Sequence, residues 1–136
     1  MKYKVAFVCV GNSCRSQMAE GFAKEYASDI FEVYSAGTDP SDEVKPNAVK
    51  VMEEVGIDIS NQYPKLLEEI PNELDILITM GCGVKCPYIP CEMREDWGLD
   101  DPDGKPIEFF RETRDTIEKN VKELIKKTKE GKIEQL

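Results

Sequence analysis

Eight residues near the amino terminus combine a cysteine, an arginine and a serine at a fixed spacing. They are Cys9, Val10, Gly11, Asn12, Ser13, Cys14, Arg15 and Ser16. An apolar run precedes them and apolar residues at helical spacing follow, so the segment is predicted to be a loop between a strand and a helix. Backbone N–H groups that gather in such a loop bind tetrahedral oxyanions such as phosphate.

The residue types of this loop supply both a binding site and a nucleophile. Arg15 offers a permanently charged, bidentate donor, and the backbone from Val10 to Arg15 offers further donors to the oxyanion. Gly11 relieves the tight turn, and Asn12 tolerates a left-handed backbone. The same positive field favours an ionised thiol at Cys9, and the hydroxyl of Ser16 can donate to its sulfur.

Each of these residues also has an ordinary structural interpretation. Cys9 could simply end a strand as a small buried residue, and Arg15 could lie on the surface of a helix. Their joint occurrence at a strand-to-helix junction favours the functional interpretation. Cys14 has no evident chemical task, and we expect it to pack in the core.

Composition excludes several classes of function. The chain has no histidine, which excludes Cys-His and Ser-His-Asp catalytic groups. Acidic residues outnumber basic ones, 27 against 18, so a nucleic-acid partner is not expected. Five cysteines without a secretory signal indicate reduced thiols in the cytoplasm, and no apolar run is long enough to span a membrane. The Glu- and Lys-rich last thirty residues are typical of a solvated helix face.

The order of the elements predicts an α/β fold. Strands are expected over residues 5–9, 31–36 and 74–80, with a short fourth strand around residues 96–99. Helices are expected after the loop, from Pro46 to about Val55, and from Ile107 to about Ile125. The pattern predicts one domain over residues 1–136, a flavodoxin-like open sheet of four parallel strands with helices on both faces. We expect a monomer.

Two further segments follow predicted strands, and ligands bind at the carboxyl ends of strands in such sheets. Residues 81–91 contain three cysteines, Cys82, Cys86 and Cys91, and Lys85 could favour deprotonation of a neighbouring thiol. Asp101 precedes a proline, which favours an extended backbone on a loop and suits a proton donor. We expect both segments to meet the Cys9 loop, although Asp100 is an alternative to Asp101.

The segment from Val8 to Ser16 resembles the signature of the low-molecular-weight protein tyrosine phosphatases and of the arsenate reductases built on the same fold. Gln17 resembles the reductases, because the phosphatases usually have proline there. Similarity continues at residues 34–37, 55–60 and 95–102. The resemblance implies a reductase that converts arsenate to arsenite, as in arsenic detoxification. A phosphatase that uses a phosphocysteine intermediate is the alternative, although Asp103 and Gly104 stand where phosphatases carry aromatic residues.

The resemblance also implies roles for individual residues. Cys9 would form an adduct with arsenate, Asp101 would donate a proton, and Cys82 and Cys86 would form a disulfide relay. No tightly bound cofactor is implied, and the external reductant would be thioredoxin, or glutathione with glutaredoxin. The spacing of the cysteines is shorter than in the thioredoxin-coupled relatives, so Cys91 is an alternative to Cys86.

Metal binding and sensing are the remaining alternatives. A zinc site built on the three cysteines lacks a fourth clear ligand, so no metal site is predicted. Some related reductases bind potassium through residues that correspond to Asn12, Glu20 and Ser35. Lys65 stands where their aspartate would be, and its ammonium could replace the cation. A metalloid sensor that binds arsenite on its cysteines without turnover would use the same residues.

Overall fold

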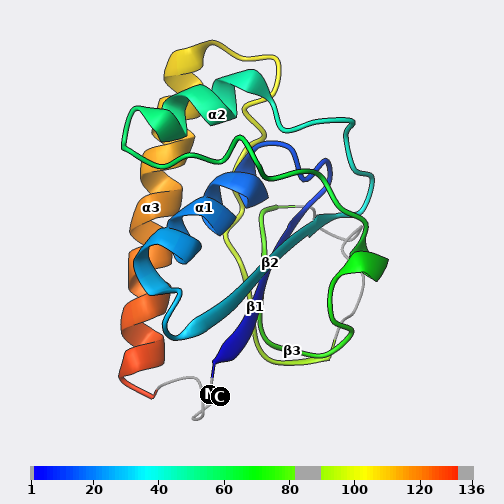
Figure 1. Cartoon of the computed structure of the whole chain (residues 1–136), viewed down its shortest axis with the longest axis vertical. Helices are drawn as coiled ribbons and strands as arrows, with labels where there is room; N and C mark the ends of the chain where they lie inside the picture. The colour runs from blue at the N-terminus through cyan, green and yellow to red at the C-terminus, as the bar shows by residue number, and fades with distance from the viewer. Residues whose placement is uncertain (1, 82–89, 132–136) are drawn as a thin grey trace.

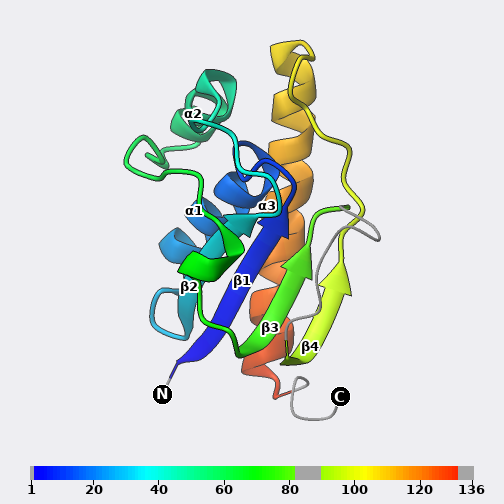
Figure 2. The ribbon, with the colours of Figure 1, turned by 90° about the vertical axis from the view of Figure 1, so that its right-hand side faces the viewer.

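The computed structural model of the chain describes residues 2–81 and 90–131, and an open parallel sheet lies at its centre. Within these residues the strand order is β2-β1-β3-β4, with all pairs parallel; Figure 1 shows the helices α1, α2 and α3 beside the sheet, and Figure 2 labels all four strands. The strands are β1 (Tyr3–Cys9), β2 (Phe31–Gly37), β3 (Leu74–Thr79) and β4 (Cys91–Asp96). The helices are α1 (Arg15–Ala27), α2 (Pro46–Glu53), the short 3-10 helix η1 (Leu67–Glu69) and α3 (Ile107–Lys129).

The central strand β1 is buried on both faces, as its continuous apolar run predicts. Val5 and Phe7 point to the face on which α1, α2 and α3 pack, and form one core with them. Ala6 and Val8 point to the other face, where the segment that contains η1 covers them with Ile70. Helical segments therefore lie on both faces, with the three longer helices on one of them, and the α/β expectation is confirmed.

Each helix follows from a local sequence signal. Pro46 occupies the first turn of α2, where its missing N–H costs nothing. In α3, Phe110, Ile117, Val121 and Leu124 recur on one buried face. None of the helices in the described part of the chain is both long enough and apolar enough to cross a membrane.

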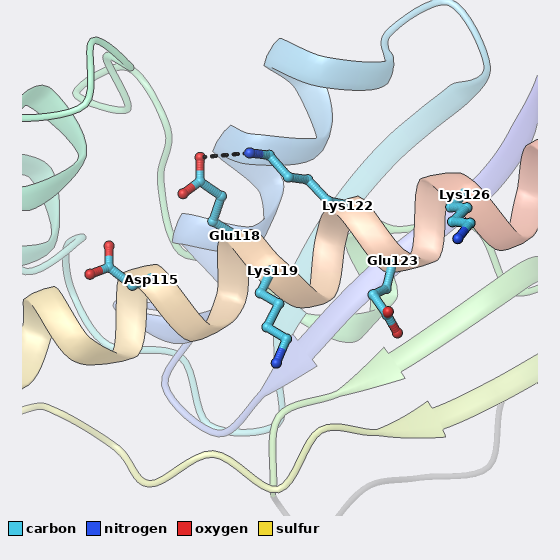
Figure 3. A pocket seen from close by; sticks show the side chains of 6 residues that line it. All are labelled: Asp115, Glu118, Lys119, Lys122, Glu123 and Lys126. Carbon is cyan, nitrogen blue, oxygen red and sulfur yellow. Dashed lines mark ion pairs between the residues drawn. The ribbon is translucent and has the colours of Figure 1, made fainter.

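The exposed face of α3 confirms the predicted solvated helix face for the part of the charged stretch that the structure describes, up to residue 131. A shallow hollow of about 420 Å³ lies along it, lined by three acidic and three basic side chains. Figure 3 shows these side chains along the helix, with an ion pair of 3.7 Å between Glu118 and Lys122. Such exposed pairs contribute little free energy and indicate no ligand.

The fourth strand differs from the sequence prediction. We expected it around residues 96–99, whereas β4 runs from Cys91 to Asp96. Its residues are mostly charged, because β4 is an edge strand and only Met93 is turned fully into the core. An edge strand has one side without a hydrogen-bonded neighbouring strand and one face in solvent, so it tolerates charged side chains. These charges obscure the pattern of apolar residues by which a strand is predicted from sequence.

The carboxyl ends of β1, β3 and β4 meet at one edge of the sheet. The three strand arrows point to the same end of the molecule (Figure 2). The loop after β1 leads into α1 there, and the connection from β4 to α3 passes the same edge (Figures 1 and 2). This edge is where ligands bind in open α/β sheets.

Candidate active site

The sulfur of Cys9 lies at the end of β1 and receives two polar contacts from the loop that follows. The backbone N–H of Asn12 donates to it over 3.1 Å, and the hydroxyl of Ser16 lies 2.9 Å away. Asn12 has a φ of +49°, the left-handed conformation that its residue type allows. Cys9 is 2% exposed, so these donors replace water around the sulfur.

The carbonyl groups of the loop point outward. Thr38, Asp39, Ser41 and Lys45 donate backbone N–H bonds to the carbonyls of Cys9, Val10, Gly11 and Ser13, at 2.8–3.1 Å. A trans peptide holds its C=O and N–H on opposite sides, so the N–H groups of the same peptides turn away from residues 38–45. Gly37 enables this close packing, since a Cβ there would lie 2.5 Å from the carbonyl oxygen of Val10.

Arg15 begins α1 and is 5% exposed. One of its terminal nitrogens donates to the carbonyls of Met80 (2.6 Å) and Leu99 (2.8 Å). Its Nε is buried and has no hydrogen-bond partner within residues 2–81 and 90–131. A buried, charged N–H without an acceptor is costly, and an oxyanion bound in the loop would provide that acceptor.

Asp101 lies beside the guanidinium group of Arg15. Its Oδ2 is 3.8 Å from a terminal nitrogen of Arg15, and its side chain is 53% exposed. Its other oxygen accepts the backbone N–H of Asp103 at 3.0 Å. The prediction that residue 101 would reach the Cys9 loop is therefore confirmed, and its carboxyl group stands between the loop and solvent.

A family model described as low molecular weight phosphotyrosine protein phosphatase matches residues 4–86. The chain belongs to this family. Among its members, a glutaredoxin arsenate reductase of Synechocystis is 47% identical over 128 residues, which cover 91% of this chain and 97% of the relative.

Solved structures of arsenate reductases agree with this assignment to the low molecular weight phosphotyrosine protein phosphatase family. An arsenate reductase in the phosphate binding state superposes with a TM-score of 0.85 at 47% identity, over 93% of this chain and 98% of that one. A thioredoxin-dependent arsenate reductase of Corynebacterium glutamicum gives a TM-score of 0.80 at 34% identity. That alignment covers 96% of this chain and 63% of the other. The expected resemblance to the reductases of the family is confirmed.

Cys14 is part of the core, as the absence of a chemical task for it led us to expect. It is 2% exposed, and burial raises the pKa of its thiol to about 12, with a smaller contribution from the charges of Asp101 and Asp103. A thiol with such a high pKa is a poor nucleophile at neutral pH. Within the loop, Cys9 is therefore the cysteine suited to chemistry.

A buried glutamine that the sequence did not single out for this task supports the loop. Gln17 is fully buried, and its side-chain nitrogen donates to the carbonyl oxygens of Asn12 (2.9 Å) and Tyr63 (3.0 Å). Its side-chain oxygen accepts from Gln62 at 2.7 Å. In the sequence, Gln17 was noted only because the phosphatases usually have proline at this position. That difference does not by itself indicate that Gln17 supports the loop.

Lys65 lies next to the residues that correspond to the potassium ligands of related reductases. Its ammonium is 3.7 Å from a carboxylate oxygen of Glu20, which also accepts the hydroxyl of Ser35. Its backbone N–H donates to the side-chain oxygen of Asn12 at 2.8 Å. Burial lowers the pKa of Lys65, and the charge of Glu20 partly opposes this. The ammonium thus pairs with Glu20, one of the three residues that correspond to the potassium ligands, and its replacement of the cation stays a prediction.

The remaining cysteines do not all lie at this edge of the sheet. Cys82 and Cys86 fall outside the described residues. Cys91 begins β4 opposite Leu74, at the amino end of the sheet, so the expectation that the whole segment 81–91 gathers near Cys9 is wrong for this residue. The length of β4, about 16 Å at the usual rise per residue, separates Cys91 from the edge that holds the loop. Among the described residues, no group of three or more cysteine, aspartate or glutamate side chains could hold a metal ion.

Proposed function

We propose that this chain reduces arsenate to arsenite, with Cys9 as the nucleophile. Two features of the same loop carry the proposal: the sulfur of Cys9 faces two donors, and the buried Nε of Arg15 has no hydrogen-bond partner among the residues that the structure describes. The donors suit a thiolate, and Arg15 suits the oxygens of a tetrahedral anion. The arsenate reductases among the relatives support arsenate rather than phosphotyrosine as the substrate.

In the first step the Cys9 thiolate attacks arsenic and forms a sulfur–arsenic bond. Asp101 donates a proton to the departing oxygen, which leaves as water. Arg15 and the backbone N–H groups from Val10 to Arg15 hold the remaining oxygens. The hydroxyl of Ser16 donates a hydrogen bond to the sulfur before the attack.

In the second step the Cys82 thiolate attacks the sulfur of Cys9. The sulfur–arsenic bond breaks, its electron pair stays on arsenic, and arsenite leaves as a Cys9–Cys82 disulfide forms. Cys86 then attacks Cys82, which frees Cys9 and leaves a Cys82–Cys86 disulfide. Met80, two residues before Cys82 in the sequence, contacts Arg15, which supports this use of Cys82. The position of Cys91 at the far end of β4 favours Cys86 over Cys91.

An external dithiol must reduce the final disulfide. One relative is named for glutaredoxin and another for thioredoxin, which supports a thiol reductant in either case. We propose thioredoxin as the partner and a monomeric, single-domain enzyme as the working form, with no tightly bound cofactor.

The test is arsenate-dependent consumption of NADPH, first with thioredoxin and thioredoxin reductase, then with glutathione, glutaredoxin and glutathione reductase. Arsenite is quantified as the product, and hydrolysis of an aryl phosphate is measured in parallel. Cys9→Ser is expected to abolish both reactions, whereas Cys82→Ser and Cys86→Ser should abolish only arsenate turnover. Cys91→Ser is the matched control and should retain turnover.

Three results would overturn the proposal. The first is aryl phosphate hydrolysis without arsenate turnover in either reductant system, which would indicate a phosphatase. The second is stoichiometric arsenite binding without turnover, which would indicate a sensor. The third is full turnover by Cys82→Ser and Cys86→Ser, which would remove the relay.

A further inference from the structure

Lys45 contacts both the loop of Cys9 and the segment that carries Asp101. It lies directly before α2, and its backbone N–H donates to the carbonyl of Ser13 at 2.9 Å. Its ammonium is 3.7 Å from Oδ2 of Asp103. One residue thus joins two segments that are far apart in the sequence.

Asp103 in turn contacts Asp101. Its backbone N–H donates to Oδ1 of Asp101, which leaves Oδ2 on the side of Arg15, 3.8 Å from a guanidinium nitrogen. The position of Asp103 therefore sets the direction in which the carboxyl group of Asp101 points. Because Lys45 pairs with the side chain of Asp103, it acts on Asp101 through a single intervening residue.

The segment of residues 97–106, which carries Asp101 and Asp103, needs a contact such as the Lys45–Asp103 pair, because it is irregular and partly open to solvent. Residues 97–106 form no helix or strand, and both Gly98 and Gly104 have positive φ. The side chains of Asp101 and Asp103 are 53% and 49% exposed. Arg15 holds the carbonyl of Leu99, and Pro102 is buried. Beyond them, however, a cavity of about 230 Å³ is lined by Lys45 on one side and by Gly104 and Lys105 on the other, and the Lys45–Asp103 pair lies at this cavity.

We propose that Lys45 is a positioning residue for proton donation: it holds Asp103, whose backbone N–H orients the carboxyl group of Asp101 toward Arg15 and the bound oxyanion. The inference rests on the proposed function, since it takes Asp101 as the proton donor. An exposed ion pair adds little to stability, but a small misplacement of a reacting group lowers a rate strongly.

The test uses the full chain and pre-reduced protein in single-turnover reduction of arsenate, which gives the rate at saturation and the half-saturating arsenate concentration separately. Since a general acid typically contributes a factor of 10² or more, Lys45→Met is expected to lower the saturated rate about tenfold. The half-saturating concentration should stay the same. Asp103→Asn should reproduce the loss, and Lys45→Arg should retain most of the rate.

Two controls separate positioning from general effects of charge or folding. Lys105 lines the same cavity but lies over the ring of Phe109, 4.5 Å from its centre, so Lys105→Met removes an equal charge without the contact to Asp103. It should leave the rate unchanged. In an Asp101→Asn background, Lys45→Met should cause no further loss, because the group that it positions is already absent.

The inference is overturned if Lys45→Met keeps the full rate, if it changes only the half-saturating concentration, or if its loss is as large in the Asp101→Asn background. The first result would mean that the pair is a simple surface contact, and the second that Lys45 merely attracts the anion. If Asp101→Asn itself keeps the full rate, Asp101 is not the proton donor and this part of the proposed function fails. A wild-type chain that reduces no arsenate would instead refute the proposed function as a whole.

Discussion

The side-chain nitrogen of Asn12 donates a hydrogen bond to the hydroxyl oxygen of Ser16 over 2.7 Å. Because this bond occupies an acceptor position of the hydroxyl, the hydroxyl proton is left to point at the sulfur of Cys9, 2.9 Å away. The side-chain oxygen of Asn12 is held by the backbone N–H of Lys65, which fixes the orientation of the amide. The loop thus determines the direction of a proton as well as the position of a sulfur.

Removing the Ser16 hydroxyl should make Cys9 less reactive. A hydrogen bond to a charged group contributes about 1.5–3 kcal/mol, so Ser16→Ala should slow alkylation of Cys9 by iodoacetamide at pH 7 by about tenfold or more. The measurement is the alkylation rate at Cys9 by mass spectrometry. Ser28→Ala, on the exposed residue after α1, is the matched control. An unchanged rate in Ser16→Ala would show that the hydroxyl does not stabilise the thiolate.

Cys14 should stay unmodified under conditions that label Cys9. Burial raises the pKa of Cys14 to about 12, so at pH 8 only roughly one thiol in 10⁴ is ionised, and the ionised form becomes a major fraction only near pH 12. Iodoacetamide should therefore label Cys9 and leave Cys14 as a thiol in the folded protein, while both react in urea. Phosphate in the buffer should protect Cys9. Faster labelling of Cys14 than of Cys9 in the native state would contradict this prediction.

Gln17 should stabilise the fold more than its neighbour Gln62. Gln17→Met leaves the carbonyl of Asn12 and the amide of Gln62 without their buried partner, so we expect a loss of about 2–3 kcal/mol in the free energy of unfolding. Gln62→Met leaves the side-chain oxygen of Gln17 without its donor but keeps the bonds of Gln17 to Asn12 and Tyr63, so it should cost less, about 1 kcal/mol. Urea denaturation of both variants measures the difference. Equal losses would mean that Gln17 is not the residue that supports the loop.

The sequence predicted the Cys9 loop well because its determinants are local. A strand end, a turn residue that adopts a positive φ and a helix start lie within eight positions, and their residue types indicate their conformations. The contacts of Gln17 with Tyr63 and of Lys45 with Asp103 join residues more than 40 positions apart. No periodicity or spacing encodes such pairs, so they required the fold. The edge strand β4 was misplaced for a different reason, since its solvated face carries charges that mask the pattern of a strand.

The ammonium of Lys65 should make the enzyme independent of potassium. It lies 3.7 Å from the carboxylate oxygen of Glu20 that also accepts the hydroxyl of Ser35, so an added cation would meet a positive charge. Replacing potassium chloride by sodium chloride at constant ionic strength should leave arsenate turnover and the melting temperature of the wild type unchanged. Lys65→Asp restores the residue type that the resemblance gives to potassium-binding relatives. In this variant, potassium at tenfold its Kd should add roughly 1.4 kcal/mol to the free energy of unfolding, whereas sodium should not. A wild-type chain that potassium already stabilises would show that the lysine does not replace the cation.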